Sequence, residues 1–442
     1  MQFKQEAHQV VSYDAYRTKL ECMIRDDVAP RLARDRPNLV VFNEDTGLET
    51  IATGSRGLAA RAIAANPAHE PSCETLGVPC GTLAAIGALD AGYAKQLAAY
   101  RARFPGLGPI SGVFVAATDT FVRAFMQTFS EMARRYGVYI VASNTQARFR
   151  ESTASTDIDT FMDPDLPRPR SVYVATGPAV YDTAFVWGPH DVRGGPPMLR
   201  NVVATNDKVP LTALEQQIGL TPGVSTGPAA VANLRPYAIP GTAARLGIAT
   251  SLPAFAYGEP PAGADPCSDT STYYMRCLDK LGANVVLQPD ANPGRWAGNG
   301  SSYWQPLEWM GSAYRAVSDP SVHFAYAVNP LMVGNLADLA FDGQTAIAQR
   351  GLRGPGCAYV GDSALDPADG DPASAAPFAG FKPQFLALAP WVFDDGPRSQ
   401  LRAEGAKLAP GSHDPLENDY VETAAIADLT FPADSARVGC AR

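Results

Sequence analysis

The sequence lacks two features that would place it in well-defined functional classes. It has no apolar run near the ~20 residues that a membrane-spanning helix requires. It also has no run of lysine and arginine of the kind that binds nucleic-acid phosphates, and its formal charge is −9. We therefore expect no membrane span and no nucleic-acid partner.

Histidine is scarce as well, and metal-binding spacings are absent. The five histidines are scattered, without an HExxH pattern, and no cysteine pair has CxxC spacing. We expect no metal and no cofactor. The first residues show no basic stretch followed by an apolar one, so no signal peptide is visible. A cytoplasmic protein and the mature form of an exported one fit equally, and the localisation stays open.

The seven cysteines include two pairs that are close in sequence. Cys73 with Cys80, and Cys267 with Cys277, lie near proline, glycine and serine. In an oxidising compartment such pairs can close small disulfide loops. We predict disulfides in both pairs, with reduced thiols as the alternative.

The apolar pattern predicts a layered chain in which strands alternate with helices. Residues 12–36 have helical spacing, and residues 38–42 have the composition of a buried strand. No repeat is visible, and a chain of 442 residues with 46% hydrophobic residues can form one large domain with insertions. This pattern is typical of an α/β or α+β fold.

Three other stretches have a different texture. The segment at about 50–110 has clusters of glycine, alanine and proline, and we interpret it as a partly helical insertion. Residues 146–170 are polar and contain proline, which predicts a loop. The tail after about residue 372 is rich in proline and glycine, with a last strand predicted at 424–429.

Two segments offer charged side chains that are suited to catalysis. Glu44 comes at the end of the buried strand, where burial raises the pKa of a carboxylate and suits it to act as a general base. Lys208 is followed seven residues later by Glu215, and a lysine fixed near a carboxylate can stabilise an oxyanion. Considered one at a time, Glu44 also fits an ordinary residue at the end of a strand, and Lys208 also fits an ordinary exposed lysine.

A third segment offers a nucleophile. A predicted strand over 247–252 contains Ser251 near its end, and residues 282–289 supply a turn and a second strand. A small nucleophile at the elbow between a strand and a helix is exposed to substrate and lies close to a helix N-terminus.

Taken in order, these segments resemble the motifs of the nitrilase superfamily, the carbon–nitrogen hydrolases. That family has a glutamate ending an LVVFPE-like strand, a lysine in a Y-x-K-x-x-L segment followed by a second glutamate, and a cysteine in a G-x-x-I-C-x-[DE] elbow followed by G-A-D-x-[LI]-x-x-P. Residues 132–141, 180–186 and 341–345 resemble its connecting pieces, including a Y-N-T-A strand at 180–186. The resemblance extends over nearly the whole chain.

The resemblance implies a four-layer αββα sandwich over residues 1–442, with the insertion at about 50–110, an active-site loop insertion at about 253–269 and a C-terminal extension from about 372. It implies that Glu44 is the general base, that Lys208 stabilises the tetrahedral intermediate, and that Glu215 positions the site. Ser251 falls where the family has its nucleophile. The implied reaction is hydrolysis of an amide or nitrile through an acyl-enzyme, and the implied assembly is a homodimer.

The nucleophile position is where this chain departs from the family pattern. Ser251 replaces cysteine, and Pro253 replaces the acidic residue two positions later. Serine depends on an adjacent base to become reactive, so the alternative is a catalytically impaired pseudoenzyme or a ligand-binding homologue.

Two other residues compete for the role of nucleophile. Cys267 begins a C-x-D sequence, but no buried strand precedes it, so Ser251 is favoured. Ser225 lies in a G-x-S-x-G sequence that has prolines at both ends and no strand before it, which predicts a loop.

Overall fold

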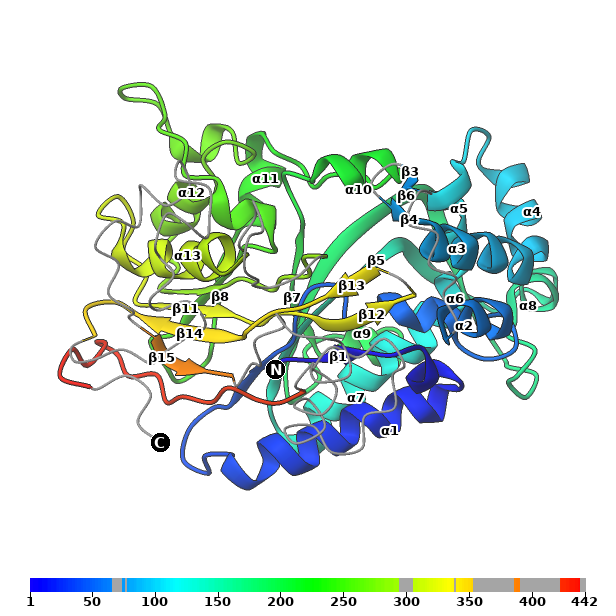
Figure 1. Cartoon of the computed structure of the whole chain (residues 1–442), viewed down its shortest axis with the longest axis horizontal. Coiled ribbons are helices and arrows are strands. Elements are labelled where there is room, and N and C mark those ends of the chain that lie inside the picture. The colour runs from blue at the N-terminus through cyan, green and yellow to red at the C-terminus, as the bar shows by residue number, and fades with distance from the viewer. Residues whose placement is uncertain are drawn as a thin grey trace.

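The protein folds into two β-sheets that pack face to face, with helices on both outer sides (Figure 1). The computed structural model describes residues 1–65, 74–75, 78–293, 305–337, 339–352, 385–389 and 422–437. Within these ranges, no helix combines the length and the apolar character that crossing a membrane requires.

The first sheet is built around a long hairpin. Its strand order is β2-β5-β6-β7, in which β2 is parallel to β5 and the other pairs are antiparallel. The strands are β2 (Leu39–Val41), β5 (Tyr139–Ser152), β6 (Val172–Trp187) and β7 (Val202–Asp207).

The second sheet has the order β15-β14-β11-β10-β9-β8. Its central strands β9, β10 and β11 are parallel, so their carboxyl ends lie at one edge of the sheet. The strands are β8 (Tyr237–Ala238), β9 (Arg245–Ile248), β10 (Val285–Leu287), β11 (Tyr326–Asn329), β14 (Ala346–Gln349) and β15 (Phe385–Leu388).

Alternation of side chains along the strands produces the four layers. Successive strand residues point to opposite faces. In β2, Val41 belongs to the cluster between the sheets, whereas Val40 packs with the outer helices. In β10, Leu287 points between the sheets and Val286 to the opposite helical layer. The outer helices are α1 (Tyr13–Met23) and α7 (Gln127–Tyr136) on the first sheet, and α12 (Tyr274–Lys280) and α13 (Gln305–Ser318) on the second. This is the αββα sandwich.

A group of helices packs beside the far end of the β5–β6 hairpin (Figure 1). It has a hydrophobic cluster of its own, which includes Tyr93, Tyr100 and Phe161. The helices are α2 (Leu58–Ala65), α3 (Cys80–Gly92), α4 (Ala94–Arg103), α5 (Pro109–Ala116) and α8 (Ser155–Phe161).

The remaining elements are short. A three-stranded sheet consists of β1 (Lys4–Gln5), β12 (Val333–Leu336) and β13 (Leu339–Phe341), and a two-stranded one of β3 (Glu74–Thr75) and β4 (Val78–Pro79). The short helices are α6 (Thr118–Phe121), α9 (Pro197–Arg200), α10 (Ala213–Gln217) and α11 (Gly227–Asn233).

Three sequence predictions differ from the structure. The loop predicted at 146–170 is present only from residue 162, because β5 continues to Ser152 and α8 follows it; the exposed Arg148 and Arg150 made a paired strand look polar. The helix predicted at 12–36 changes to a π turn after Met23 and ends in a 3-10 turn at Arg31. The strand predicted at 424–429 is not formed, and only Thr423 makes an isolated bridge there. Most of the predicted extension from about residue 372 lies outside the described residues.

Candidate active site

The strand ends bring Glu44 and Lys208 together from distant parts of the chain. Glu44 follows β2, and Lys208 directly follows β7 in the same sheet. Glu215 lies in the first turn of α10, seven residues after the lysine. The side chains of Glu44 and Lys208 are buried. The structure thus assembles three of the residues that the sequence singled out.

Lys208 connects the two glutamates. Its Nζ lies 2.6 Å from Glu44 Oε1 and 2.5 Å from Glu215 Oε1. Burial lowers the pKa of Lys208, but Glu44 and Glu215 outweigh burial and keep this pKa above its ordinary value. Lys208 is therefore a charged ammonium at neutral pH, as a group that stabilises an oxyanion must be.

The second oxygen of Glu44 is also held in place. The backbone N–H of Ala291 donates to Glu44 Oε2 at 3.0 Å. Burial raises the pKa of Glu44, and the nearby Lys208 ammonium opposes that increase without cancelling it. A carboxylate with a raised pKa and fixed geometry is suited to accept and return a proton.

Glu215 is fixed by the start of its own helix. Thr212 and Glu215 form a capping box, in which the Thr212 N–H donates to Glu215 Oε2 at 2.6 Å and the Glu215 N–H donates to Thr212 Oγ1 at 3.2 Å. One oxygen of Glu215 therefore caps α10, while the other accepts from Lys208.

Ser251 lies at a sharp elbow after β9. Its backbone has φ 56° and ψ −117°, a left-handed conformation that is rare for a residue other than glycine, and a 3-10 turn over Leu252–Phe255 follows. The elbow is held by hydrogen bonds from the Ser251 N–H to the Pro289 carbonyl (3.0 Å) and from the Ala254 N–H to the Ser251 carbonyl (2.9 Å). Backbone strain of this kind is found where a turn presents a nucleophile.

The segment 289–291 links this elbow to the general base. Pro289 accepts from the backbone of Ser251, and Ala291 donates to Glu44. Ser251 and Glu44 are thus joined through three consecutive residues at the carboxyl end of β10. Ser251 itself is 4% exposed.

The rival nucleophiles have other environments. Cys267 forms a disulfide with Cys277, so it has no free thiol. Ser225 lies in a segment without a strand before α11, as the prolines around it predicted.

Cys80 is disulfide-bonded as well, while Cys73 lies outside the described residues.

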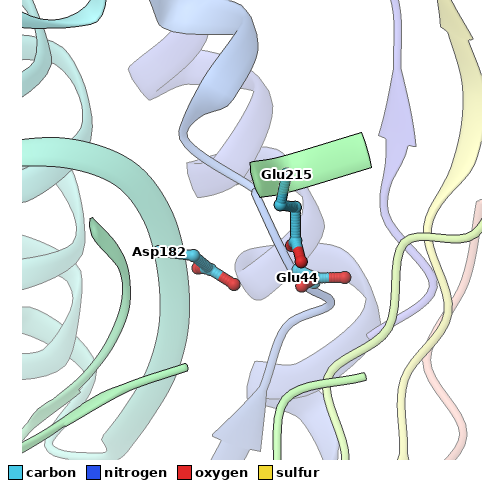
Figure 2. A group of neighbouring side chains, drawn as sticks. All are labelled: Glu44, Asp182 and Glu215. Carbon is cyan, nitrogen blue, oxygen red and sulfur yellow. The ribbon is translucent and has the colours of Figure 1, made fainter. Parts of the chain in front are cut away.

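Further carboxyl groups near Glu44 were missed from the sequence. Asp182 points from the middle of β6 toward Glu44, and carboxyl oxygens of Glu44, Asp182 and Glu215 all lie within 4.8 Å of one another (Figure 2). The one available signal was that Asp182 stands where the Y-N-T-A strand of the family has asparagine.

Two more acids, Asp45 and Asp290, act on the same group of charges as Glu44. Burial and the adjacent Glu44 raise the pKa of Asp45 to about 7. Asp290 is fully buried and accepts a hydrogen bond from Asn329, and burial raises its pKa well above the usual range. Neither residue stood out in the sequence, because an aspartate after a strand is common at turns.

The three clustered carboxyl groups have a spacing that would also fit a metal ion. However, the Lys208 ammonium is in hydrogen-bond contact with two of the three, Glu44 and Glu215. A cation therefore already occupies the place between those two carboxylates, and the arrangement fits a charged lysine better than a metal.

Comparisons with known proteins find matches among solved structures but none by sequence. No family model matches the chain, and no curated protein matches it. The amidase from Nesterenkonia sp. AN1 is 14% identical, with a TM-score of 0.34 over 68% of this chain and 82% of the amidase. A carbon–nitrogen hydrolase from Helicobacter pylori is 11% identical, with a TM-score of 0.41 over 88% of this chain and 82% of that one.

The Nesterenkonia amidase is described as a protein from the nitrilase superfamily. This is the family that the sequence motifs resemble.

Proposed function

We propose that this protein is a nitrilase-superfamily hydrolase that cleaves a non-peptide carbon–nitrogen bond in an amide or a nitrile. The observation that carries this proposal is a buried Lys208 ammonium held between Glu44 and Glu215, with Ser251 at a strained elbow that hydrogen bonds through residues 289–291 connect to Glu44. These are the parts that acyl transfer requires: a base, an oxyanion partner and a nucleophile at a turn.

For an amide, the first half of the reaction forms an ester. The Ser251 hydroxyl oxygen attacks the carbonyl carbon while its proton passes to the Glu44 carboxylate. The carbonyl oxygen becomes an oxyanion that the Lys208 ammonium stabilises. When the carbon–nitrogen bond breaks, Glu44 returns its proton to the nitrogen, which leaves as ammonia or an amine.

The second half releases the acid. Water attacks the ester carbon and gives a proton to Glu44. The bond between the acyl carbon and the Ser251 oxygen then breaks, and the serine oxygen takes the proton back from Glu44. The acid leaves, and both side chains return to their starting state.

A serine in this position predicts slow turnover. A cysteine is a few per cent thiolate at neutral pH and intrinsically nucleophilic, whereas a serine hydroxyl depends wholly on its base. Ser251 is therefore also the observation that favours the second candidate function, a homologue that binds an amide-like ligand without cleaving it.

Turnover by matched serine variants decides between the two functions. We expect the protein to release ammonia or acid from a panel of simple amides and nitriles, Ser251→Ala to lose this activity, and Ser251→Cys to exceed the unmodified protein by about tenfold or more. Ser225→Ala, in the other serine motif, is the control and should leave the rate unchanged.

Equal activity of Ser251→Ala and the unmodified protein would remove Ser251 from the mechanism. No turnover in either the unmodified protein or Ser251→Cys would favour the ligand-binding function. The homodimer stays a prediction, which sedimentation of the purified protein tests directly.

A further inference from the structure

The site contains more carboxyl groups than its ammonium can balance. Electrostatic interactions connect Lys208 with five acids. These are Glu44, Asp45, Asp182, Glu215 and Asp290. If all five were ionised, one ammonium would face five negative charges in a largely buried space, which is very costly. Some of these groups must therefore hold protons.

Hydrogen-bond donors distinguish the ionised groups from the neutral ones. Glu44 accepts from Lys208 and from the Ala291 N–H, and Glu215 accepts from Lys208 and from the Thr212 N–H. Donors of this kind favour the charged form of a carboxyl group. We therefore take Glu44 and Glu215 to be ionised.

Asp182 has the opposite environment. It is 2% exposed, and within the part of the chain that the structure describes no donor group forms a hydrogen bond with either of its carboxyl oxygens. Its carboxyl group points toward Glu44, which Figure 2 shows. An ionised aspartate would be buried here without any donor, next to another carboxylate, whereas a protonated one can donate to that carboxylate.

We propose that Asp182 is a positioning residue, which stays protonated at neutral pH and donates a hydrogen bond to the Glu44 carboxylate. That hydrogen bond stabilises the ionised form of Glu44 and so keeps the base ready to accept a proton. The protonation of Asp182 is independent of the proposed function, but its catalytic consequence rests on that function.

The backbone fixes Asp182 where this role requires it. The Lys208 N–H donates to the Asp182 carbonyl at 3.0 Å, so the two residues are neighbours across β6 and β7. On the other side, Asp182 is paired in register with Thr145 of β5, an uncharged residue.

Among the main electrostatic influences on Asp182, only one opposes its protonated form. Burial, Asp45 and Glu44 raise the pKa of Asp182, and only Lys208 lowers it among the major causes. Glu215, from α10, is also near and is acidic. The net effect is a pKa of Asp182 well above its usual value.

Infrared spectroscopy tests the protonation without any substrate. A protonated carboxyl group has a carbonyl stretch that is separate from the bands of a carboxylate. We expect the full-length protein at pH 8, where Asp45 is mostly ionised, to show this band, and Asp182→Asn to lose part of it. Asp159→Asn, an exposed acid paired with Arg168, is the control and should leave the band unchanged. Identical spectra for Asp182→Asn and the unmodified protein would overturn the proposal.

The pH dependence of kcat/KM tests the catalytic consequence. Asp182→Ala removes the donor, so the pKa of Glu44 rises and the acidic limb of the profile moves up by about one pH unit. Asp182→Asn keeps an N–H donor, so the acidic limb stays in place and any alkaline limb caused by ionisation of Asp182 disappears.

A purely structural role for Asp182 would lower the rate of both variants without moving either limb, and that result would refute the positioning role. If no variant turns over any amide, the proposed function fails, whereas the infrared result still decides whether Asp182 is protonated.

Discussion

Replacing Lys208 by methionine should destabilise the fold at neutral pH and do so less in acid. The variant keeps the volume of the side chain but leaves Glu44 and Glu215 without the ammonium that contacts both at 2.6 and 2.5 Å. Removing one partner of a buried ion pair costs about 3–5 kcal/mol of unfolding free energy, because the remaining charge is buried and unpaired.

The pH dependence has a definite sign. In the unmodified protein the pKa of Lys208 is raised, so the ammonium contributes fully throughout the neutral range and its contribution is lost only in strong alkali. In the variant, Glu44 has lost the ammonium that opposes the effect of burial, so the pKa of Glu44 rises further and this group takes up a proton as the pH falls. The difference in stability should therefore shrink between pH 8 and pH 5.

Urea unfolding followed by circular dichroism at these two pH values measures the effect. Lys95→Met, at an exposed lysine of α4, is the matched control and should change stability by under about 0.5 kcal/mol. Adding Glu44→Gln and Glu215→Gln to Lys208→Met should recover much of the loss, because the three side chains are then neutral. A loss under about 1 kcal/mol, or one that is the same at both pH values, would refute the charge account of the site.

Two further predictions concern Asp45, which follows Glu44 in the chain, and the Cys267–Cys277 disulfide. Because the pKa of Asp45 is raised to about 7, the folded state keeps a proton that the unfolded state releases near pH 4. As the pH rises between these two values, the free energy of unfolding therefore falls by about 1.4 kcal/mol per pH unit. Asp45→Asn should therefore gain stability relative to the unmodified protein as the pH rises from 4 to 7 in thermal unfolding, and a constant difference would contradict this. The Cys267–Cys277 disulfide closes a loop with a sequence separation of 10, so replacing both cysteines by serine should cost about 2–3 kcal/mol under oxidising conditions. Cys22→Ser, at a free cysteine, is the control, and an equal effect of the two changes would show that the disulfide contributes nothing.

Local pattern predicted the elements that are short, regular and well bounded. The buried strand expected at 38–42 and the strand expected within 282–289 are present as β2 and β10, because an apolar run bounded by turn residues is a local signal. The hairpin of β5 and β6 was missed where exposed arginines mask its alternation. The pairing of two sheets depends on contacts between distant residues, and the family resemblance supplied it.

The candidate site could be predicted only in part for the same reason. Glu44, Lys208 and Glu215 follow recognisable motifs, and the structure brings their side chains into contact. Asp182 has no such motif of its own, because an aspartate within a strand gains its meaning from burial and from the Glu44 carboxyl group, which comes from a distant part of the chain. Its protonation state depends on which hydrogen-bond donors surround it, and only the folded arrangement determines that.

The two hydrogen-bonding roles of Glu215 have a consequence for the region around α10. One oxygen of this carboxylate completes the first turn of a five-residue helix, and the other binds the central ammonium. A helix this short has little stability of its own, so its first turn depends on the position of that single side chain. Any substrate oxyanion that draws Lys208 away from Glu215 would therefore loosen α10, and catalysis and local order at this surface helix would change together.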